Sequence, residues 1–186
     1  MTDEEALRRL LLTRSVQHGD FVLSSGQHSS YYIDCRLSTM SAEGMVLIGR
    51  MGLAAIRQAG WAPKAVGGLT MGADPVAYAI AAASQGTELE IDAFSVRKEP
   101  KAHGTGQQIE GNFGAGDPVV VVEDTITTGG SARRAIEAVE AAGGKVLGVL
   151  AGVDREEGGK GEMEGGDVEV VVLTTATKLG VAQGGK

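Results

Sequence analysis

One short stretch, residues 119–131, brings carboxylates, hydroxyls and glycines together in a compact order. It reads VVVVEDTITTGGS, so four valines lead directly into Glu123 and Asp124 and then into a hydroxyl- and glycine-rich turn. The valine run has no polar alternation and predicts a strand buried on both faces. The turn places N–H groups and hydroxyls at the start of a helical pattern, where the helix dipole favours a phosphate. Capping alone could explain the turn, but carboxylates at a strand end also suit ribose hydroxyls, a metal ion or both.

A second stretch, residues 97–106, concentrates positive charge. It reads RKEPKAHGTG and contains Arg97, Lys98, Lys101 and His103. An isolated run of charges is most often a solvated surface loop. Here the run directly follows a predicted strand, so it begins at the carboxyl edge of the sheet, where α/β proteins bind their ligands. Glycines within it would also let it move as a lid.

The elements that must position these residues alternate between helix and strand. Amphipathic patterning predicts helices at about 3–18 and 41–59, the second with Ser41 as N-cap and Gly60 as its stop. A turn and a short strand are expected within 21–33. Further helices are expected at 76–84 and 131–142, loops at 70–75 and 98–116, and strands at 65–69, 91–96, 119–122, 146–153 and 168–173. This alternation is typical of parallel strands joined by crossover helices and predicts an α/β fold.

The composition limits the class of protein. With 186 residues, 42% of them hydrophobic, the chain is long enough for one domain, taken as 1–186. Its net charge of −7 argues against a nucleic-acid or membrane surface. No apolar run approaches the roughly 18 residues of a membrane span, and 1–9 lacks the core of a signal peptide. Cys35 is the only cysteine, so no intramolecular disulfide is possible and we expect a cytoplasmic protein.

The stretch 119–131 closely resembles the phosphoribosyl-diphosphate (PRPP) signature of the type I phosphoribosyltransferases. The hydrophobic strand, acidic pair, Thr-x-Thr-x-Gly-Gly-Ser turn and helix all occur in the family's order. The resemblance implies the type I phosphoribosyltransferase fold, a central parallel sheet flanked by helices, with a small N-terminal hood at about 1–40 and a core at about 41–186. It also implies that PRPP contacts Glu123, Asp124, Thr125, Ile126, Thr127, Thr128, Gly129, Gly130 and Ser131.

The basic stretch 97–106 narrows the resemblance from the type I phosphoribosyltransferases to one family among them. Its pattern Arg-Lys-x-x-Lys-x-His-Gly matches, residue by residue, the catalytic loop of orotate phosphoribosyltransferases. In that family the loop closes over diphosphate, and part of it comes from the neighbouring subunit. The resemblance therefore implies a homodimer with a shared active site, in which PRPP also contacts Arg97, Lys98, Lys101 and His103.

The same resemblance implies a reaction, the transfer of the 5-phosphoribosyl group from PRPP to orotate. The products are orotidine 5′-monophosphate and diphosphate, a step of pyrimidine nucleotide synthesis. Lys101 and Asp124 are the implied catalytic residues. Mg²⁺ is the implied cofactor, held mainly through PRPP, and no direct protein ligand of the metal is certain.

Orotate carries a carboxylate, and the resemblance assigns its binding to Arg155 and Thr127. Arg155 follows the predicted strand 146–153, and a guanidinium can bind a carboxylate through two parallel hydrogen bonds. The alternative is a surface cluster of salt bridges within Asp154-Arg155-Glu156-Glu157. We favour the binding role, mainly on the resemblance.

At three places in the chain the resemblance does not settle the role of the residues. Tyr31 and Tyr32 lie where the family's hood faces the base, but a tyrosine pair with one ring in the core is an equally good interpretation. Some relatives carry a lysine where this chain has Ser24. Some also have a Tyr-Lys pair where this chain has Met71 and Gly72, so a lysine contact to diphosphate is excluded there, although backbone N–H groups could still cradle it.

Three rival interpretations remain open. The chain could be a phosphoribosyltransferase for a purine or uracil, although the basic loop and Arg155 favour orotate. It could be a non-catalytic regulator that senses PRPP and binds nucleic acid, which the acidic net charge disfavours. A purely structural α/β module is the third, and three motifs in the family's order argue against it.

Overall fold

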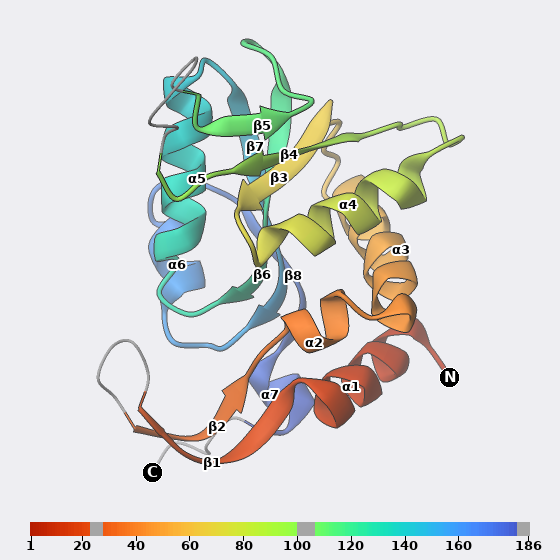
Figure 1. Ribbon diagram of the computed structural model, residues 1–186, viewed down its shortest axis with the longest axis vertical. Helices are drawn as coiled ribbons and strands as arrows, with labels where there is room; N and C mark the ends of the chain where they lie inside the picture. Colours follow the sequence, from red (N-terminus) through yellow and green to blue (C-terminus); the bar gives the residue numbers. More distant parts are fainter. Residues whose placement is uncertain (23–27, 100–106, 182–186) are drawn as a thin grey trace.

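The computed structural model describes residues 1–22, 28–99 and 107–181, and its centre is a sheet of parallel strands (Figure 1). The strands of this sheet within the described residues are β3 (Ala65–Leu69), β4 (Asp92–Val96), β5 (Ile109–Gly111), β6 (Pro118–Ile126), β7 (Lys145–Asp154) and β8 (Val170–Thr175). Their spatial order is β5-β4-β3-β6-β7-β8. Strand β5 runs antiparallel to β4 at the edge, and all other neighbours are parallel. The predicted α/β fold with a central parallel sheet is confirmed.

Strand β6 is buried on both faces, as its valine run predicts. Val119, Val120, Val121 and Val122 are all fully buried. Because successive side chains of a strand point to opposite faces, they divide between two hydrophobic cores. Val120 and Val122 belong to one core cluster, and Val119 and Val121 belong to the other. The strand that leads to the acidic pair is therefore fixed from both sides.

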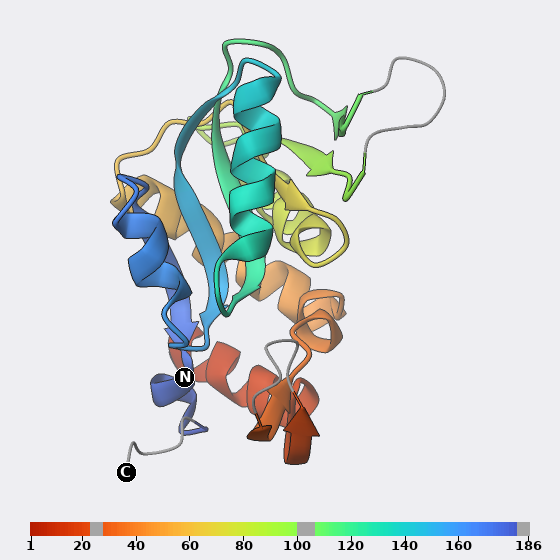
Figure 2. The same cartoon turned by 90° about the vertical axis from the view of Figure 1, so that its left-hand side faces the viewer.

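Helices cover both faces of the sheet (Figures 1 and 2). The helices α3 (Ala42–Gln58) and α4 (Ala73–Ser84) pack on one face, and α5 (Gly130–Ala141) and α6 (Gly159–Glu164) lie on the other. The predicted caps of α3 are confirmed, since the Ser41 hydroxyl accepts a hydrogen bond from the Gly44 N–H and Gly60 has a φ of 72° just after the helix.

The N-terminal region forms a small separate layer below the sheet. It consists of α1 (Asp3–Arg14), the antiparallel pair β1 (Val16–Val22) and β2 (His28–Ile33), and the short helix α2 (Arg36–Thr39), with α7 (Ala176–Leu179) packed nearby. The prediction of one helix over 3–18 is wrong beyond residue 14. The backbone of Val16 pairs with Ile33 instead, and the hydroxyl of Ser15 is buried 2.6 Å from that of Ser38.

Other boundaries shift for local reasons. Helix α4 begins at Ala73 rather than at 76, because a proline is tolerated in the first helical turn. The expected loop 98–116 contains β5, which pairs with β4, and β6 continues through the acidic pair to Ile126. No helix among residues 1–22, 28–99 and 107–181 is long and apolar enough to cross a membrane.

Candidate active site

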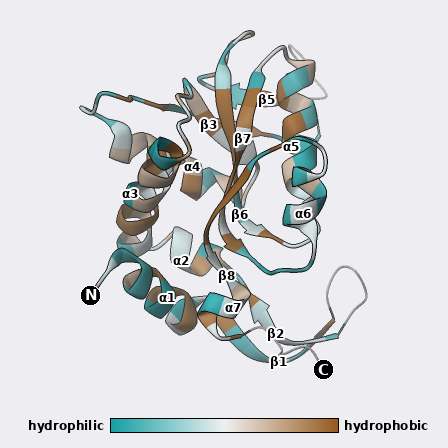
Figure 3. Ribbon diagram, turned by 180° about the vertical axis from the view of Figure 1, so that it is seen from behind, coloured by the Kyte–Doolittle hydropathy of each residue, from teal (hydrophilic) through white to brown (hydrophobic). Residues whose placement is uncertain are grey.

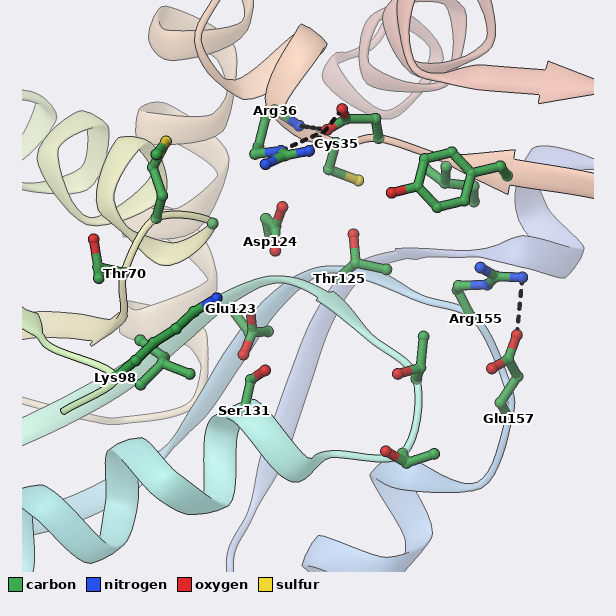
Figure 4. Close-up of a pocket in the computed structure, with 18 of the residues that line it drawn as sticks. Cys35, Arg36, Thr70, Lys98, Glu123, Asp124, Thr125, Ser131, Arg155 and Glu157 are labelled. Atoms are coloured by element: carbon green, nitrogen blue, oxygen red, sulfur yellow. Dashed lines mark hydrogen bonds and ion pairs between the residues drawn. The ribbon is translucent and has the colours of Figure 1, made fainter. Parts of the chain in front are cut away.

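A cavity of about 830 Å³ opens between the carboxyl ends of the central strands and the N-terminal layer (Figure 4). Residues from β2 and α2, the loop after β3, β6, α5 and the segment after β7 line it, including Tyr32, Arg36, Thr70, Gly72, Lys98, Glu123, Asp124, Thr125, Thr127, Thr128, Ser131, Arg155 and Glu157. An adjoining hollow of about 220 Å³ surrounds the turn after β6. The two hollows share Glu123 and several turn residues, so they can hold connected parts of one ligand.

The turn after β6 presents hydroxyls and backbone N–H groups to the smaller hollow. The lining of this hollow includes every residue of the predicted turn, namely Thr125, Ile126, Thr127, Thr128, Gly129, Gly130 and Ser131. Gly129 has a φ of 77°, a conformation that glycine adopts without strain, and α5 begins directly after it with no side-chain cap. The N–H groups at the start of α5 are therefore open to a ligand, and an anion is the ligand that this helix end favours.

The two adjacent carboxylates occupy different parts of the site. Figure 4 shows Asp124 on the side of β6 toward Cys35 and Arg36, and Glu123 on the side toward Ser131. Glu123 is buried, and its Oε2 has no hydrogen-bond partner among the described residues. A buried acceptor without a partner is costly, so this atom is suited to a donor from a ligand.

The environment disfavours ionisation of both groups. Burial raises the pKa of Glu123 well above its usual value, and the neighbouring charge of Asp124 raises it further. Burial also raises the pKa of Asp124, opposed in part by Glu123 and by the positive charge of Arg36. The thiol of Cys35 beside them is fully buried, and burial raises its pKa to about 12. Cys35 is therefore a neutral part of the cavity wall.

The loop after β3 closes the cavity on the Asp124 side. Thr70 and Met71 line the cavity and are joined by a cis peptide bond. The Thr70 hydroxyl donates a hydrogen bond to Asp74, and that carboxylate also accepts one from Ser95 on β4. The loop is thus tied to the sheet by side chains, while its backbone and Gly72 face the cavity.

Arg155 lies at the end of β7 and points into the cavity, as predicted. Its side chain is only 4% exposed, and its guanidinium carbon lies 4.8 Å from the centroid of the Tyr31 ring. Arg155 Nη2 is 2.9 Å from Glu157 Oε1, whereas its Nε has no hydrogen-bond partner among the described residues. The interpretation of Arg155 as part of a surface cluster does not fit this burial.

The basic stretch is described only in part. Lys98 lines the cavity, but Arg97 turns away to an ion pair with Glu110, at 2.9 Å between Nε and Oε1. The backbone N–H of Arg97 donates to the Gln108 carbonyl at 2.8 Å, and Gln108 Nε2 donates to the Arg97 carbonyl at 3.0 Å. Lys101 and His103 lie outside the described residues.

The tyrosine pair is divided between core and cavity. Tyr31 is buried in the hydrophobic core with its ring beneath Arg155, whereas Tyr32 lines the cavity and contacts Phe21, with ring centroids 5.7 Å apart. One ring therefore lies in the core, as one of the two interpretations expected, and the position of Tyr32 in the cavity lining leaves a contact with the base as a prediction. Ser24 lies outside the described residues.

Sequence reasoning assigned no place in the cavity to three charged residues that line it, Asp34, Arg36 and Glu157. Arg36 binds Asp34 through two hydrogen bonds, from Nε at 2.8 Å and Nη2 at 3.0 Å, and Glu157 pairs with Arg155. A signal for the first pair existed, since Asp34 and Arg36 directly follow a predicted strand as the acidic pair does. No group of three or more potential metal ligands (histidine, cysteine or acidic) occurs within the described part of the chain.

Comparison with known proteins gives a consistent family. No protein-family model matches the chain. It is 44% identical over 183 residues to the orotate phosphoribosyltransferase of Rhodopirellula baltica, covering 96% of this chain and 95% of that one.

Two solved structures of Mycobacterium tuberculosis H37Rv orotate phosphoribosyltransferase are also similar, and each match covers 96% of this chain and 99% of the other. The complex with iron(III) dicitrate has a TM-score of 0.85 at 42% identity. The complex with PRPP has a TM-score of 0.81 at 38% identity.

Proposed function

The chain belongs to the orotate phosphoribosyltransferase family, and we propose that it transfers the 5-phosphoribosyl group of PRPP to orotate. The bond between ribose C1 and diphosphate breaks, and a bond forms between C1 and N1 of orotate, which loses its proton. The products are orotidine 5′-monophosphate and diphosphate, so the enzyme is a pentosyltransferase of pyrimidine nucleotide synthesis. One observation supports this proposal most strongly. The guanidinium of Arg155, whose Nε has no hydrogen-bond partner among the described residues, and the turn 125–131 line two adjoining hollows.

The turn 125–131 binds the 5′-phosphate of PRPP in this proposal. The support is the hollow of about 220 Å³ around it, lined by hydroxyls and by the open N-terminus of α5. Hydrogen bonds from fixed backbone N–H groups hold a phosphate without a positively charged side chain. This fits the lining of that hollow, where Arg134 is the only basic residue among those that the structure describes.

Glu123 and Asp124 bind the ribose hydroxyls. The unpartnered Glu123 Oε2 can accept a hydrogen bond from one hydroxyl, and Asp124 faces the larger cavity where the rest of the sugar lies. Positive charge develops on the sugar ring as the bond to diphosphate breaks. Carboxylates fixed beside the ring stabilise that charge, because preorganised groups need no rearrangement during the reaction. Asp124 is a proposed catalytic residue on this basis.

Arg155 and Thr127 orient orotate. The orotate carboxylate supplies an acceptor for the free Nε of Arg155, and Tyr31 holds the guanidinium plane from below. Thr127 lines both hollows and can contact the base from the turn. Holding N1 of orotate against C1 of the ribose removes much of the entropic barrier to reaction. No covalent intermediate with the protein is required.

The charge around the cavity supports Mg²⁺ as the cofactor of the proposed reaction. Among the described lining residues, Asp34, Glu123, Asp124 and Glu157 are acidic, and only Arg36, Lys98 and Arg155 are basic. A diphosphate ester would meet too little positive charge there. The donors present fit Mg²⁺, a hard ion that prefers oxygen, and Asp124 and Glu123 would hold it together with PRPP oxygens rather than as a complete protein cage. When bound, the ion screens the charge of the diphosphate.

The basic stretch supplies the remaining positive charge. Lys98 already lines the cavity, and Lys101 and His103 follow it along the chain. We assign Lys98, Lys101 and His103 to the diphosphate of PRPP, with Lys101 stabilising the leaving group. Arg97 fits this role less well, because its side chain is paired with Glu110 outside the cavity.

A homodimer with a shared active site completes the proposal. Large apolar side chains are exposed on α2 and directly after it, on α3 and α4, and on the loop after β3, namely Leu37, Met40, Met45, Val46, Met71 and Tyr78. Figure 3 shows that hydrophobic residues are frequent along α3. Burial of such a surface by a second copy is favourable. Light scattering at assay concentration should give the mass of a dimer, and a fully active monomer would refute the shared site.

Two further expectations from the sequence also stand as proposals. The buried, single Cys35 is compatible with a cytoplasmic location. The one-domain organisation of 1–186, with a hood at about 1–40, is supported by the packing of α1 and β2 into the same core cluster as α3 and α4.

A spectrophotometric assay of orotate consumption with PRPP tests the proposed function. We expect loss of orotate that depends on Mg²⁺ and on PRPP together. A panel of uracil, adenine, guanine and hypoxanthine under the same conditions is the control for base choice. Turnover of another base in place of orotate would overturn the substrate, and PRPP binding with no turnover of any base would overturn the enzymatic role.

A further inference from the structure

Arg155 already has a carboxylate partner within the cavity, and that carboxylate belongs to the protein. Glu157 Oε1 lies 2.9 Å from Arg155 Nη2, and both residues line the cavity (Figure 4). We propose that Glu157 is an internal competitor for the substrate, whose carboxylate must displace that of Glu157 from Arg155. This inference rests on the proposed function, since it takes orotate as the carboxylate-bearing substrate.

The structure indicates which partner moves. Arg155 is held at three points, by its backbone N–H on the Ile126 carbonyl at 2.9 Å, by the Tyr31 ring and by the burial of its side chain. The Glu157 side chain is 26% exposed, and the ion pair with Arg155 is the one interaction of that side chain within the described residues. Glu157 can therefore turn toward water while Arg155 stays in place.

The ion pair is also incomplete. Glu157 engages Nη2, but the buried Nε of Arg155 has no hydrogen-bond partner among the described residues. A buried donor left without an acceptor is costly, and a guanidinium bound by both oxygens of a carboxylate is more stable. A substrate carboxylate that reaches both Nε and Nη2 therefore forms the better pair. The exchange of one carboxylate for another leaves the charge of the cavity wall balanced.

This arrangement selects among anions. A simple carboxylate gains only the contact with Arg155, and its binding breaks the ion pair between Arg155 and Glu157. Orotate adds contacts of its ring with the cavity, so it can displace Glu157 where a simple carboxylate cannot. Glu157 thus weakens binding of orotate somewhat, and in return it keeps other carboxylates off Arg155 in the free enzyme.

The variant Glu157→Gln tests the proposal, because it removes the charge and keeps the size of the side chain. We expect the KM for orotate to fall about threefold to tenfold, and the KM for PRPP to stay unchanged. Inhibition by benzoate, a carboxylate without the orotate ring, should strengthen by a similar factor. Glu162→Gln is the matched control, since Glu162 pairs with Arg133 at 2.8 Å on the surface, away from the cavity.

Two outcomes overturn the inference. One is a KM for orotate that rises in Glu157→Gln, which would mean that Glu157 orients Arg155 for the substrate. The other is an unchanged benzoate inhibition. Glu157→Asp retains the charge with a shorter reach and should give a KM between those of the parent and Glu157→Gln. Failure of the parent enzyme to consume orotate would overturn the proposed function instead, and calorimetric binding of benzoate to both proteins would still test the competition.

Discussion

Gly72 and Asp124 lie so close together in the cavity wall that a β-carbon at position 72 would stand 2.5 Å from Asp124 Oδ1. The φ of Gly72 is −63°, which any residue adopts. The requirement for glycine is therefore steric rather than conformational. The loop after β3 can approach the carboxylate on β6 only because position 72 has no side chain.

We expect Gly72→Ala to damage the site and spare the fold. The new methyl group would push Asp124 or the loop aside by a few tenths of an ångström or more, and an error of that size in a catalytic group is costly. The kcat/KM for PRPP should fall at least about tenfold, with a melting temperature near that of the parent. Gly161→Ala is the matched control, because nothing lies within 4 Å of the added carbon there. Equal kinetics in the two variants would contradict the steric argument.

Arg155→Lys should weaken the binding of orotate and leave that of PRPP nearly unchanged. An ammonium group cannot form two parallel hydrogen bonds with a carboxylate, and it would lose the planar contact with Tyr31. We expect the KM for orotate to rise about tenfold or more in steady-state assays. Arg133→Lys changes an exposed arginine with a comparable glutamate partner and serves as control. A parallel rise in both KM values would instead indicate a general disturbance of the site.

Lys101→Ala should lower kcat about a hundredfold, the usual cost of removing one group that stabilises charge in the transition state. The circular dichroism spectrum and melting temperature should not change, because none of the described helices and strands includes Lys101. Lys160→Ala, which removes a surface lysine near Glu164, is the control. A kcat close to that of the parent enzyme would refute the assignment of Lys101 to the leaving diphosphate.

The buried carboxylate of Glu123 should make the ligand-free enzyme less stable as the pH rises. The pKa of Glu123 in the folded protein lies above its ordinary value of 4.5. The folded state therefore binds more protons than the unfolded chain between those two values. By linkage, the stability that the group contributes is present below pH 4.5 and is lost as the pH rises through the folded pKa.

Glu123→Gln removes this titration. We expect the melting temperatures of the two ligand-free proteins to be similar near pH 4.5 and the variant to become progressively more stable at higher pH. The same variant should lose activity, because we propose that Glu123 binds a ribose hydroxyl of PRPP. Glu164→Gln, an exposed site, provides the reference for a change of net charge. A difference in melting temperature that does not vary with pH would contradict the prediction.

Local patterns in the sequence predicted much of this fold and site. The valine run, the turn and the start of α5 are consecutive in the chain, so the strand, the hydroxyl-rich turn and the acidic pair could all be inferred without knowing the packing. The capping of α3 by Ser41 and its end before Gly60 depend on neighbouring residues alone. Arg155 was proposed mainly on the family resemblance, and its place after a predicted strand agrees with its position in the lining of the cavity.

The remaining features depend on partners that are distant in sequence. Helix α1 ends early because Val16 pairs with Ile33, and β5 exists because Ile109 pairs with Val96. The close approach of Gly72 to Asp124 likewise joins segments that only the folded sheet brings together. No local pattern distinguishes a glutamate that faces water from one that, like Glu157, faces a buried guanidinium.

Hydrogen bonds between Arg97 and Gln108 join the two ends of the segment that contains most of the basic stretch. The two ends of the segment between them are held next to the paired strands β4 and β5. The pairing of these strands therefore does not depend on the number of residues in the segment. Lengthening such a segment costs only the slowly growing entropy of loop closure. The number of residues between Arg97 and Gln108, a segment that includes Lys101 and His103, can thus change independently of the sheet that holds its two ends.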